Sequence, residues 1–272
     1  MAKAIRTNDQ YQKDIVDMLS GMVGRFSRWQ IWQDFIMMSA YSISNAVDKR
    51  HSEKREKAYM NIAGKYSSNE LEKFVAMLGN VVTGLERNPD QDFLGELFMN
   101  LDLSNEWKGQ FFTPYSVCRC MAGMLMSDDV LGKITDKGWV SVNDPACGAG
   151  ALLIAYANEC IKRHINYQQS VLFVAQDIDL TAGMMCYIQL SLLGCPGYVV
   201  IQNTLTNPAT SIDGRGLIPV DDSSNVWYTP MYCMAPWSVR RMIAGMDMFF
   251  KSQSHITETK PVDCGQQQLS LF

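Results

Sequence analysis

The chain has 272 residues, of which 47% are hydrophobic and 19% are charged, and its formal net charge is −4. This charge excludes a strong overall basic field of the kind that small nucleic-acid binders carry, although a local basic patch would suffice for binding. No apolar run reaches the roughly 18 residues of a membrane span, and the eight cysteines show neither a zinc spacing nor a disulfide framework. We therefore expect a soluble, cytoplasmic protein with reduced thiols.

The first hundred residues are predicted to be helical. From residue 7 to about 100, apolar residues recur at three- and four-residue spacing, and Ser68 or Asn69 is a plausible N-cap for a later helix. The basic residues of "DKRHSEKREKAY" alternate with acidic ones, which favours a solvated helix face over a phosphate contact; they are Arg50, Lys54, Arg55 and Lys57. We assign residues 1–105 to an N-terminal helical region.

From about residue 139 the pattern alternates between strands and helices. The candidate strands are "WVSVND", "VLFVAQD", "YVVIQNT" and "NVWYTP", and the helices between them are "ALLIAYANECIKRHI" and "LTAGMMCYIQLSLLG". Continuous apolar strands separated by helices predict an α/β fold with a parallel sheet that is covered on both faces. We place this domain at residues 106–250, with a long polar loop at 206–225 and a mobile tail at 251–272.

The stretch "DPACGAG" carries the first indication of a ligand. Gly148 and Gly150 allow a sharp turn between a strand and a helix, and Asp177 ends the next strand. In open α/β sheets ligands bind beyond the carboxyl ends of the strands, where Asp177 could accept ribose hydroxyls. A dinucleotide site or a merely tight turn would share the glycines. Asp144, however, would repel a pyrophosphate and suits a positively charged cofactor, which makes an NAD enzyme the weaker interpretation.

With "GQFFTP" about thirty residues upstream, "DPACGAG" resembles the motif pair of adenine-N6 DNA methyltransferases of the type I modification-subunit kind. The resemblance covers about residues 92–205. It implies a Rossmann-like, S-adenosylmethionine-dependent methyltransferase fold that acts on an adenine flipped out of DNA. The cofactor-binding residues that it implies are Thr113, Pro114, Asp144, Ala146, Gly148, Gly150, Asp177 and Asn203. Asn203 stands where this family usually has aspartate, and its amide can still bind an adenine edge.

Two stretches compete for the catalytic Asn/Asp-Pro-Pro-Tyr/Phe motif of this family. We favour "TPMY", which ends the fourth strand and makes Thr229, Pro230 and Tyr232 the catalytic residues, with Tyr232 stacking on the base. The alternative is Asn207-Pro208 in "NPAT". Thr229 is a poorer acceptor than an amide, and losing one such acceptor typically costs about 10²–10³ in rate. The alternative function is therefore a non-catalytic, DNA-associated or regulatory protein of the same fold.

Only forty residues follow Tyr232. We expect the fold to be truncated after the fourth strand, so that a separate specificity subunit, the N-terminal helices or substrate access would determine any choice of DNA target. Arg240 and Arg241 lie in the predicted last helix, "WSVRRMIAGMDMFF", and we expect them on its solvated face rather than on DNA phosphates. Methyl transfer needs mainly positioning, so we expect no metal.

The last five residues, "QLSLF", are similar to the peptide by which bacterial replication and repair proteins dock on the DNA polymerase sliding clamp. The resemblance implies that Gln268, Leu269, Leu271 and Phe272 bind this partner, which would tether the chain close to DNA. Docking of the tail on the protein's own core is the alternative. Both resemblances imply a bacterial cell or a phage-infected one.

Overall fold

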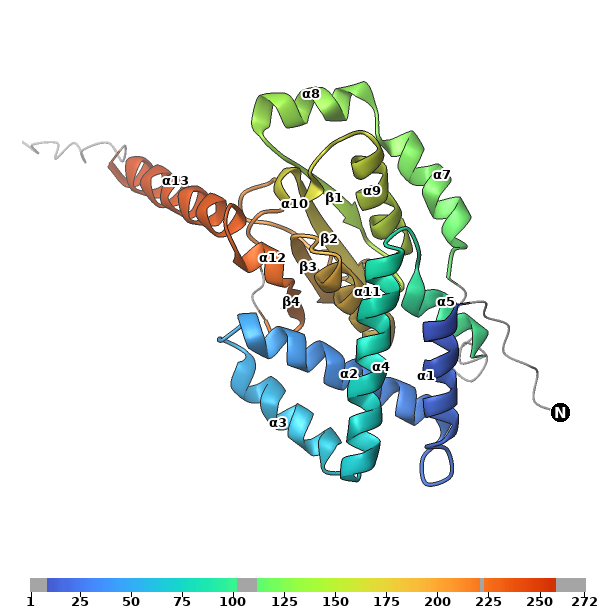
Figure 1. Ribbon diagram of the computed structural model, residues 1–272. Helices are drawn as coiled ribbons and strands as arrows, with labels where there is room; N and C mark the ends of the chain where they lie inside the picture. Colours follow the sequence, from blue (N-terminus) through green and yellow to red (C-terminus); the bar gives the residue numbers. More distant parts are fainter. Residues whose placement is uncertain (1–8, 102–111, 221–222, 258–272) are drawn as a thin grey trace, which may run out of the picture.

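The computed structural model describes residues 9–101, 112–220 and 223–257, with side chains described as far as residue 250. Within these ranges no helix is both long and apolar enough to cross a membrane. Helices and a four-stranded sheet make up the molecule (Figure 1), which confirms the α/β class.

The first hundred residues form helices, as their periodicity predicts. In chain order these are α1 (Gln10–Ser20), α2 (Arg28–Val47), α3 (Ser52–Ala63), α4 (Ser68–Arg87) and α5 (Phe93–Asn100). The N-cap of α4 is Ser67, one residue before the predicted position, and it forms a capping box with Glu70. The apolar core of these helices is continuous with that of the α/β part.

The α/β part follows with short connections. Its elements are α7 (Tyr115–Leu125), α8 (Asp128–Lys137), β1 (Val140–Asp144), α9 (Ala151–Lys162), α10 (Tyr167–Ser170), β2 (Val171–Asp177), α11 (Leu180–Leu192), β3 (Gly197–Ile201), β4 (Val226–Tyr228), α12 (Pro230–Cys233) and α13 (Trp237–Thr257). The last helix continues through the predicted boundary at residue 250.

The strand order is β1-β2-β3-β4, and β1, β2 and β3 run parallel. β4 is antiparallel to β3, with Tyr228 opposite Tyr198 and Val226 opposite Val200. The prediction of a wholly parallel sheet is therefore wrong at its fourth strand. A parallel connection needs a long crossover, usually through a helix. The described part of the chain between Ile201 and Val226 contains turns and bends but no helix, so it returns beside β3.

The two faces of the sheet are covered differently. Helices α9 and α11 pack on one face, in the core that the N-terminal helices share. The second face carries apolar strand residues that include Leu172 and Val200, and it is covered mainly by Trp139, Leu217, Tyr232 and Trp237. These residues come from the start of β1, the loop after β3, α12 and the start of α13. Loop and short-helix residues thus take the place that flanking helices were predicted to occupy.

Candidate functional site

The turn between β1 and α9 requires glycine at two positions. Gly148 has a φ of 53° and Gly150 has a φ of 96°, a region that L side chains rarely adopt. A Cβ atom at Gly148 would lie 3.0 Å from Phe112, and one at Gly150 would lie 2.9 Å from the Cys186 sulfur. The sequence folds into this loop because only glycine tolerates both the backbone conformation and the close neighbours.

Hydrogen bonds tie this loop to the end of β2. The Gly148 N–H donates to Asp177 Oδ2 at 2.8 Å, and the Cys147 N–H donates to the Gln176 carbonyl at 3.0 Å. Asp144, at the end of β1, accepts a hydrogen bond from the Ala146 N–H at 3.1 Å. Burial raises the pKa of Asp144, and the nearby Asp177 carboxylate adds to this rise. Two acidic side chains therefore lie at adjacent carboxyl ends of parallel strands.

A cavity of about 210 Å³ adjoins the loop. Four of the predicted cofactor residues line it, namely Thr113, Asp144, Ala146 and Gly148, and Phe112, Cys118 and Met121 add apolar walls. Pro114 lines a neighbouring cavity of about 550 Å³, which also contains Thr113. Among the described residues, neither lysine nor arginine lines the smaller cavity, and Asp144 is the one carboxylate that does.

The rest of the predicted cofactor set lies along the same edge. Asn203 follows β3, where its side-chain oxygen accepts a hydrogen bond from the Leu205 N–H at 2.9 Å. Beside it, the Gln202 N–H donates to the Asp177 carbonyl at 3.0 Å. Ile178 and Leu205 are 65% and 94% exposed, and such apolar side chains next to polar groups could cover a nucleoside base. Sequence reasoning missed both, although each stands within two residues of a predicted site residue.

A buried polar link supports the loop from behind. Asp92 caps α5, where its Oδ1 accepts from the Gly95 N–H at 3.0 Å and from Gln189 Nε2 at 2.8 Å. Gln189 Nε2 also lies 2.9 Å from the Ala149 carbonyl of the glycine loop. Burial raises the pKa of Asp92, while its hydrogen bonds from Gln189 and Gly95 oppose the rise. Helix α5 and the loop after β1 are therefore held together through one carboxylate and one amide.

The structure does not bring Thr229, Pro230 and Tyr232 to this edge. Because β4 runs antiparallel, Thr229 lies beside Gly197 at the start of β3, about 13 Å from the carboxyl end of that strand. Thr229 is fully buried, and its hydroxyl donates to the Cys195 carbonyl at 2.8 Å and accepts from the Gly197 N–H at 3.0 Å. The ring of Tyr232 is also buried, with its hydroxyl donating to the Leu217 carbonyl. These contacts disagree with the interpretation of "TPMY" as a base-positioning motif.

Asn207-Pro208, the alternative stretch, lies at the carboxyl edge instead. The Asn207 N–H donates to the Asn203 carbonyl at 2.7 Å, and its carbonyl accepts from Gln176 Nε2 at 2.8 Å. Both Asn207 and Pro208 are exposed and line a cavity of about 200 Å³ beyond β3. The backbone of Asn207 is thus held on the same edge of the sheet as the glycine loop, and its side chain is exposed.

The predicted solvated arginines have defined contacts. Arg55 is buried, contrary to the prediction, because its guanidinium binds Asp48 at 2.6 Å and lies 4.0 Å from the centre of the Trp227 ring. Arg240 donates to the Gln169 carbonyl, and Arg241 lies over the ring of Tyr232. These three side chains therefore hold elements together rather than forming one basic surface.

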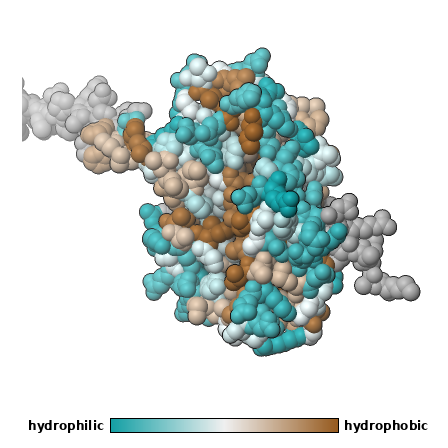
Figure 2. Space-filling view, viewed as in Figure 1, coloured by the Kyte–Doolittle hydropathy of each residue, from teal (hydrophilic) through white to brown (hydrophobic). Residues whose placement is uncertain are grey.

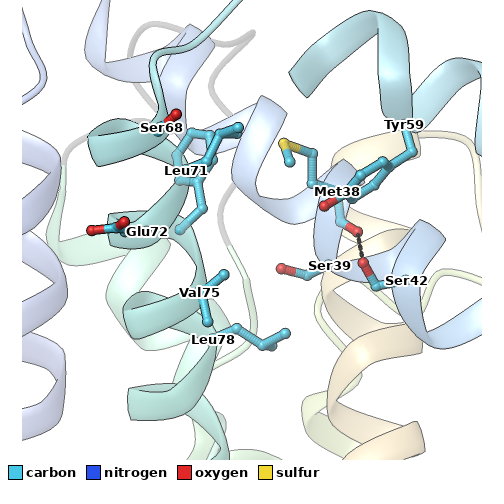
Figure 3. A pocket seen from close by; sticks show the side chains of 10 residues that line it. Met38, Ser39, Ser42, Tyr59, Ser68, Leu71, Glu72, Val75 and Leu78 are labelled. Atoms are coloured by element: carbon cyan, nitrogen blue, oxygen red, sulfur yellow. Dashed lines mark hydrogen bonds between the residues drawn. The ribbon is translucent and has the colours of Figure 1, made fainter. Parts of the chain in front are cut away.

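A separate pocket of about 420 Å³ lies between α2, α3 and α4 (Figure 3). Met38, Tyr59, Leu71 and Leu78 point into it, and Ser42 beside them donates to the Met38 carbonyl. It shares no lining residue with the glycine loop, so it is not part of the candidate site.

Two other predictions concern the C-terminal peptide and metal binding. Residues 268–272 lie outside the described part of the chain, so the peptide "QLSLF" stays a prediction. Within the described ranges no group of three or more histidine, cysteine, aspartate or glutamate side chains could hold a metal ion.

A glycine turn between a parallel strand and a helix, with acidic side chains at the ends of two adjacent strands, defines an α/β protein with an acidic carboxyl edge. The family model of N-6 DNA methylases matches residues 92–253, which is more than half of the chain. The chain belongs to this family, as its two motifs predict. The match begins at Asp92, the residue that links α5 to the glycine loop. Comparison with curated proteins gave no significant match.

Proposed function

We propose that this chain binds S-adenosylmethionine at the carboxyl edge of β1, β2 and β3 and transfers its methyl group to N6 of adenine in DNA. The observation that carries this proposal is the glycine loop beside a cavity that Asp144 lines and no described cation lines, with Asp177 bound to the same loop through the Gly148 N–H. The cofactor carries positively charged ammonium and sulfonium groups, which carboxylates attract. The pyrophosphate of a dinucleotide is negatively charged, and carboxylates would repel it. Membership of the N-6 DNA methylase family supports the acceptor.

We assign a different part of the cofactor or the substrate to each polar residue at this edge. S-adenosylmethionine, when bound, supplies a methyl group on a positively charged sulfur. Asp177 would hold the ribose, since one of its oxygens already fixes the loop through Gly148, and Asp144 would face the amino-acid portion. We assign the adenine to Asn207, because its exposed amide oxygen can accept a hydrogen bond from the base amine. Transfer then depends on holding the amine in line with the methyl group.

Calorimetry with S-adenosylmethionine tests the cofactor. Asp177→Asn should weaken binding about tenfold or more, because it replaces the charged acceptor of the Gly148 N–H with a neutral group. Asp128→Asn makes the same chemical change on the exposed face of α8 and should bind like the unmodified chain. Absence of binding by the unmodified chain would remove the proposal.

Transfer of a tritiated methyl group to unmethylated DNA tests the reaction. Asn207→Ala should lower the rate about 10²–10³-fold, the usual effect of losing one acceptor aimed at the reacting group. Thr229→Asn should give no gain in rate, because residue 229 lies at the other edge of the sheet. A large gain with Thr229→Asn, or no change with Asn207→Ala, would return the catalytic role to "TPMY".

A non-catalytic role is the second candidate. The observation that favours it is the burial of Thr229 and Tyr232, which leaves no described aromatic ring beside Asn207 in the cavity that it lines. Such a protein would bind the cofactor without incorporating methyl groups into DNA. Cofactor binding by calorimetry, together with no transfer to any unmethylated DNA, would identify it.

Recruitment through the last five residues belongs to this proposal. Gln268, Leu269, Leu271 and Phe272 would dock on the sliding clamp, and a separate specificity subunit would choose the target sequence. Deleting residues 268–272 should abolish retention on immobilised clamp while cofactor binding stays unchanged. Unchanged retention would exclude clamp docking and favour the tail's own-core alternative.

A further inference from the structure

The outer edge of β1 is open. β1 is the first strand in the sheet order, and no strand in the described ranges pairs with its outer side. None of its residues is fully buried, and Ser141 and Asn143 are exposed, whereas every residue of β2 except Asp177 is buried. Because backbone groups alternate between the two sides of a strand, β1 leaves one set of donors and acceptors without a strand partner.

The opposite edge of the same sheet is closed by side chains. Arg55 Nη2 donates to the Val226 carbonyl at 2.8 Å, and the Tyr187 hydroxyl donates to the Tyr228 carbonyl at 3.2 Å. Proteins commonly block an open edge with lysine, proline or a bulge, because such an edge invites pairing with another chain.

β1 contains neither lysine nor proline. Just outside β1, the Arg215 guanidinium donates to the Trp139 carbonyl at 3.1 Å, and Pro145 has no N–H. Pairing at this edge is therefore confined to the backbone groups of β1 itself, whereas at β4 side chains bind carbonyls within the strand.

We propose that β1 pairs with β1 of a second copy of this chain, which makes one continuous eight-stranded sheet. Identical strands related by a two-fold axis run antiparallel. With the axis at Val142, the two Val142 side chains face each other, and Ser141 of each copy lies opposite Asn143 of the other. A hydroxyl opposite an amide can form a cross-strand hydrogen bond. The two Asp144 carboxylates lie at opposite ends of the pair, so like charges stay apart.

Helix α13 offers the apolar area that a five-residue strand lacks, since a standard interface buries about 800 Å² on each partner. Large apolar side chains recur along it at three- and four-residue spacing and are exposed, namely Val239, Met242, Ile243, Met246, Phe249 and Phe250. We call these six residues the α13 stripe. The helix projects from the body, and hydrophobic surface is visible along it (Figures 1 and 2).

The α13 stripe begins close to the open edge. The ring of Trp237, at the start of α13, lies 5.5 Å from that of Trp139, the residue that precedes β1. Ile243 of the stripe lines a cavity of about 370 Å³ together with Trp139. A second copy docked on β1 therefore lies within reach of this helix, and burying the stripe removes an exposed apolar surface of the kind that marks interaction sites.

Sedimentation velocity of the full chain tests the pairing. At micromolar concentration the unmodified chain should sediment as a species of twice the chain mass of 30.7 kDa. Ser141→Lys with Asn143→Lys places like charges opposite each other and should give a monomer. Ser141→Lys with Asn143→Glu places opposite charges at the same contacts and should keep the dimer. Both positions are exposed, and thermal melting of each variant checks that it is folded.

The matched control is Ser20→Lys with Asn61→Lys, which adds the same two charges at exposed positions on α1 and α3 and should leave the dimer intact. A monomeric unmodified chain at all concentrations would overturn the proposal. So would a dimer that survives both lysines at β1. If that dimer is lost with Met246→Glu, the contact belongs to α13 alone. If both double variants, Ser141→Lys with Asn143→Lys and Ser141→Lys with Asn143→Glu, lose the dimer, the proposed antiparallel register is wrong. The proposal does not depend on methyl transfer, so each can fail alone.

Discussion

The two outer edges of the sheet, at β1 and at β4, differ in whether their outward backbone groups have partners. At β4, side chains from α3 and α11 bind the outward carbonyls of Val226 and Tyr228. At β1, the outward groups face no described strand, and the strand is only partly buried. The N-terminal helices therefore do more than cover the core, because α3 supplies the arginine that closes one edge. The open edge belongs to the strand that carries the glycine loop.

This difference locates the parts that are free to interact. The β4 edge is built from long-range contacts among Arg55, Asp48, Trp227 and Tyr41, and a change there should unfold or loosen the domain. The β1 strand is only partly buried, and the side chains of Ser141 and Asn143 are exposed. Changes at β1 should therefore affect binding and association more than stability.

The largest expected effect is at the closed edge. Arg55→Met should lower the free energy of unfolding by up to about 3–5 kcal/mol, because it takes the guanidinium away from the buried Asp48 and leaves His51 as its remaining ion-pair partner. Denaturant unfolding measures this loss. Lys57→Ala, on the exposed side of the same helix, should change stability by less than about 0.5 kcal/mol. Adding Asp48→Asn to Arg55→Met should recover part of the loss, since no unpaired charge then remains. Equal losses for Arg55→Met and Lys57→Ala would mean that α3 does not close the edge.

A smaller effect is expected where β4 ends. Thr229→Val keeps the side-chain shape but removes the acceptor of the buried Gly197 N–H, and an unsatisfied buried donor costs about 1–3 kcal/mol. Denaturant unfolding should show this loss, while calorimetry with S-adenosylmethionine should show unchanged affinity. Thr210→Val, at an exposed position of the loop after β3, is the matched control. A large loss of cofactor affinity with Thr229→Val would place Thr229 in the site after all.

Asp92→Asn tests the polar link behind the glycine loop. Because burial raises the pKa of Asp92 in the folded chain, the folded state holds the proton more tightly than the unfolded state. The stability of the unmodified chain should therefore fall as the pH rises from 3.8, the ordinary pKa of an aspartate, through the raised pKa of Asp92. The asparagine keeps an acceptor for Gln189 but does not titrate, so its advantage over aspartate should grow across that pH window. Unfolding curves at several pH values measure it, and a constant difference would show that Asp92 does not titrate there.

Most helices, the first three strands and the glycine loop could be predicted because their signals are local. Apolar periodicity, two glycines and an acid at the end of each of two strands suffice to place them. The sequence does contain the signal for the direction of β4, because residues 206–225 are predicted to be a loop, and a connection without a helix favours an antiparallel return over a parallel crossover. The burial of Arg55 depends on Trp227, which is distant in sequence. The antiparallel direction of β4 is also what places Thr229 and Tyr232 at the other edge of the sheet.

The smallest effect concerns hydrogen exchange at β1. In a monomer, β1 amides should exchange faster than those of β3, because an edge strand with exposed residues opens at a lower free-energy cost than a buried central strand. If two β1 strands pair, this exchange should slow as protein concentration rises from well below to well above the dissociation constant. Exchange at Val199 and Val200 should stay the same, since β3 is central at either concentration. The Ser141→Lys with Asn143→Lys variant should lose the concentration dependence but keep its melting temperature within a few degrees. Slow, concentration-independent exchange at β1 would mean that its edge is already satisfied within one chain, and the contrast with β4 would disappear.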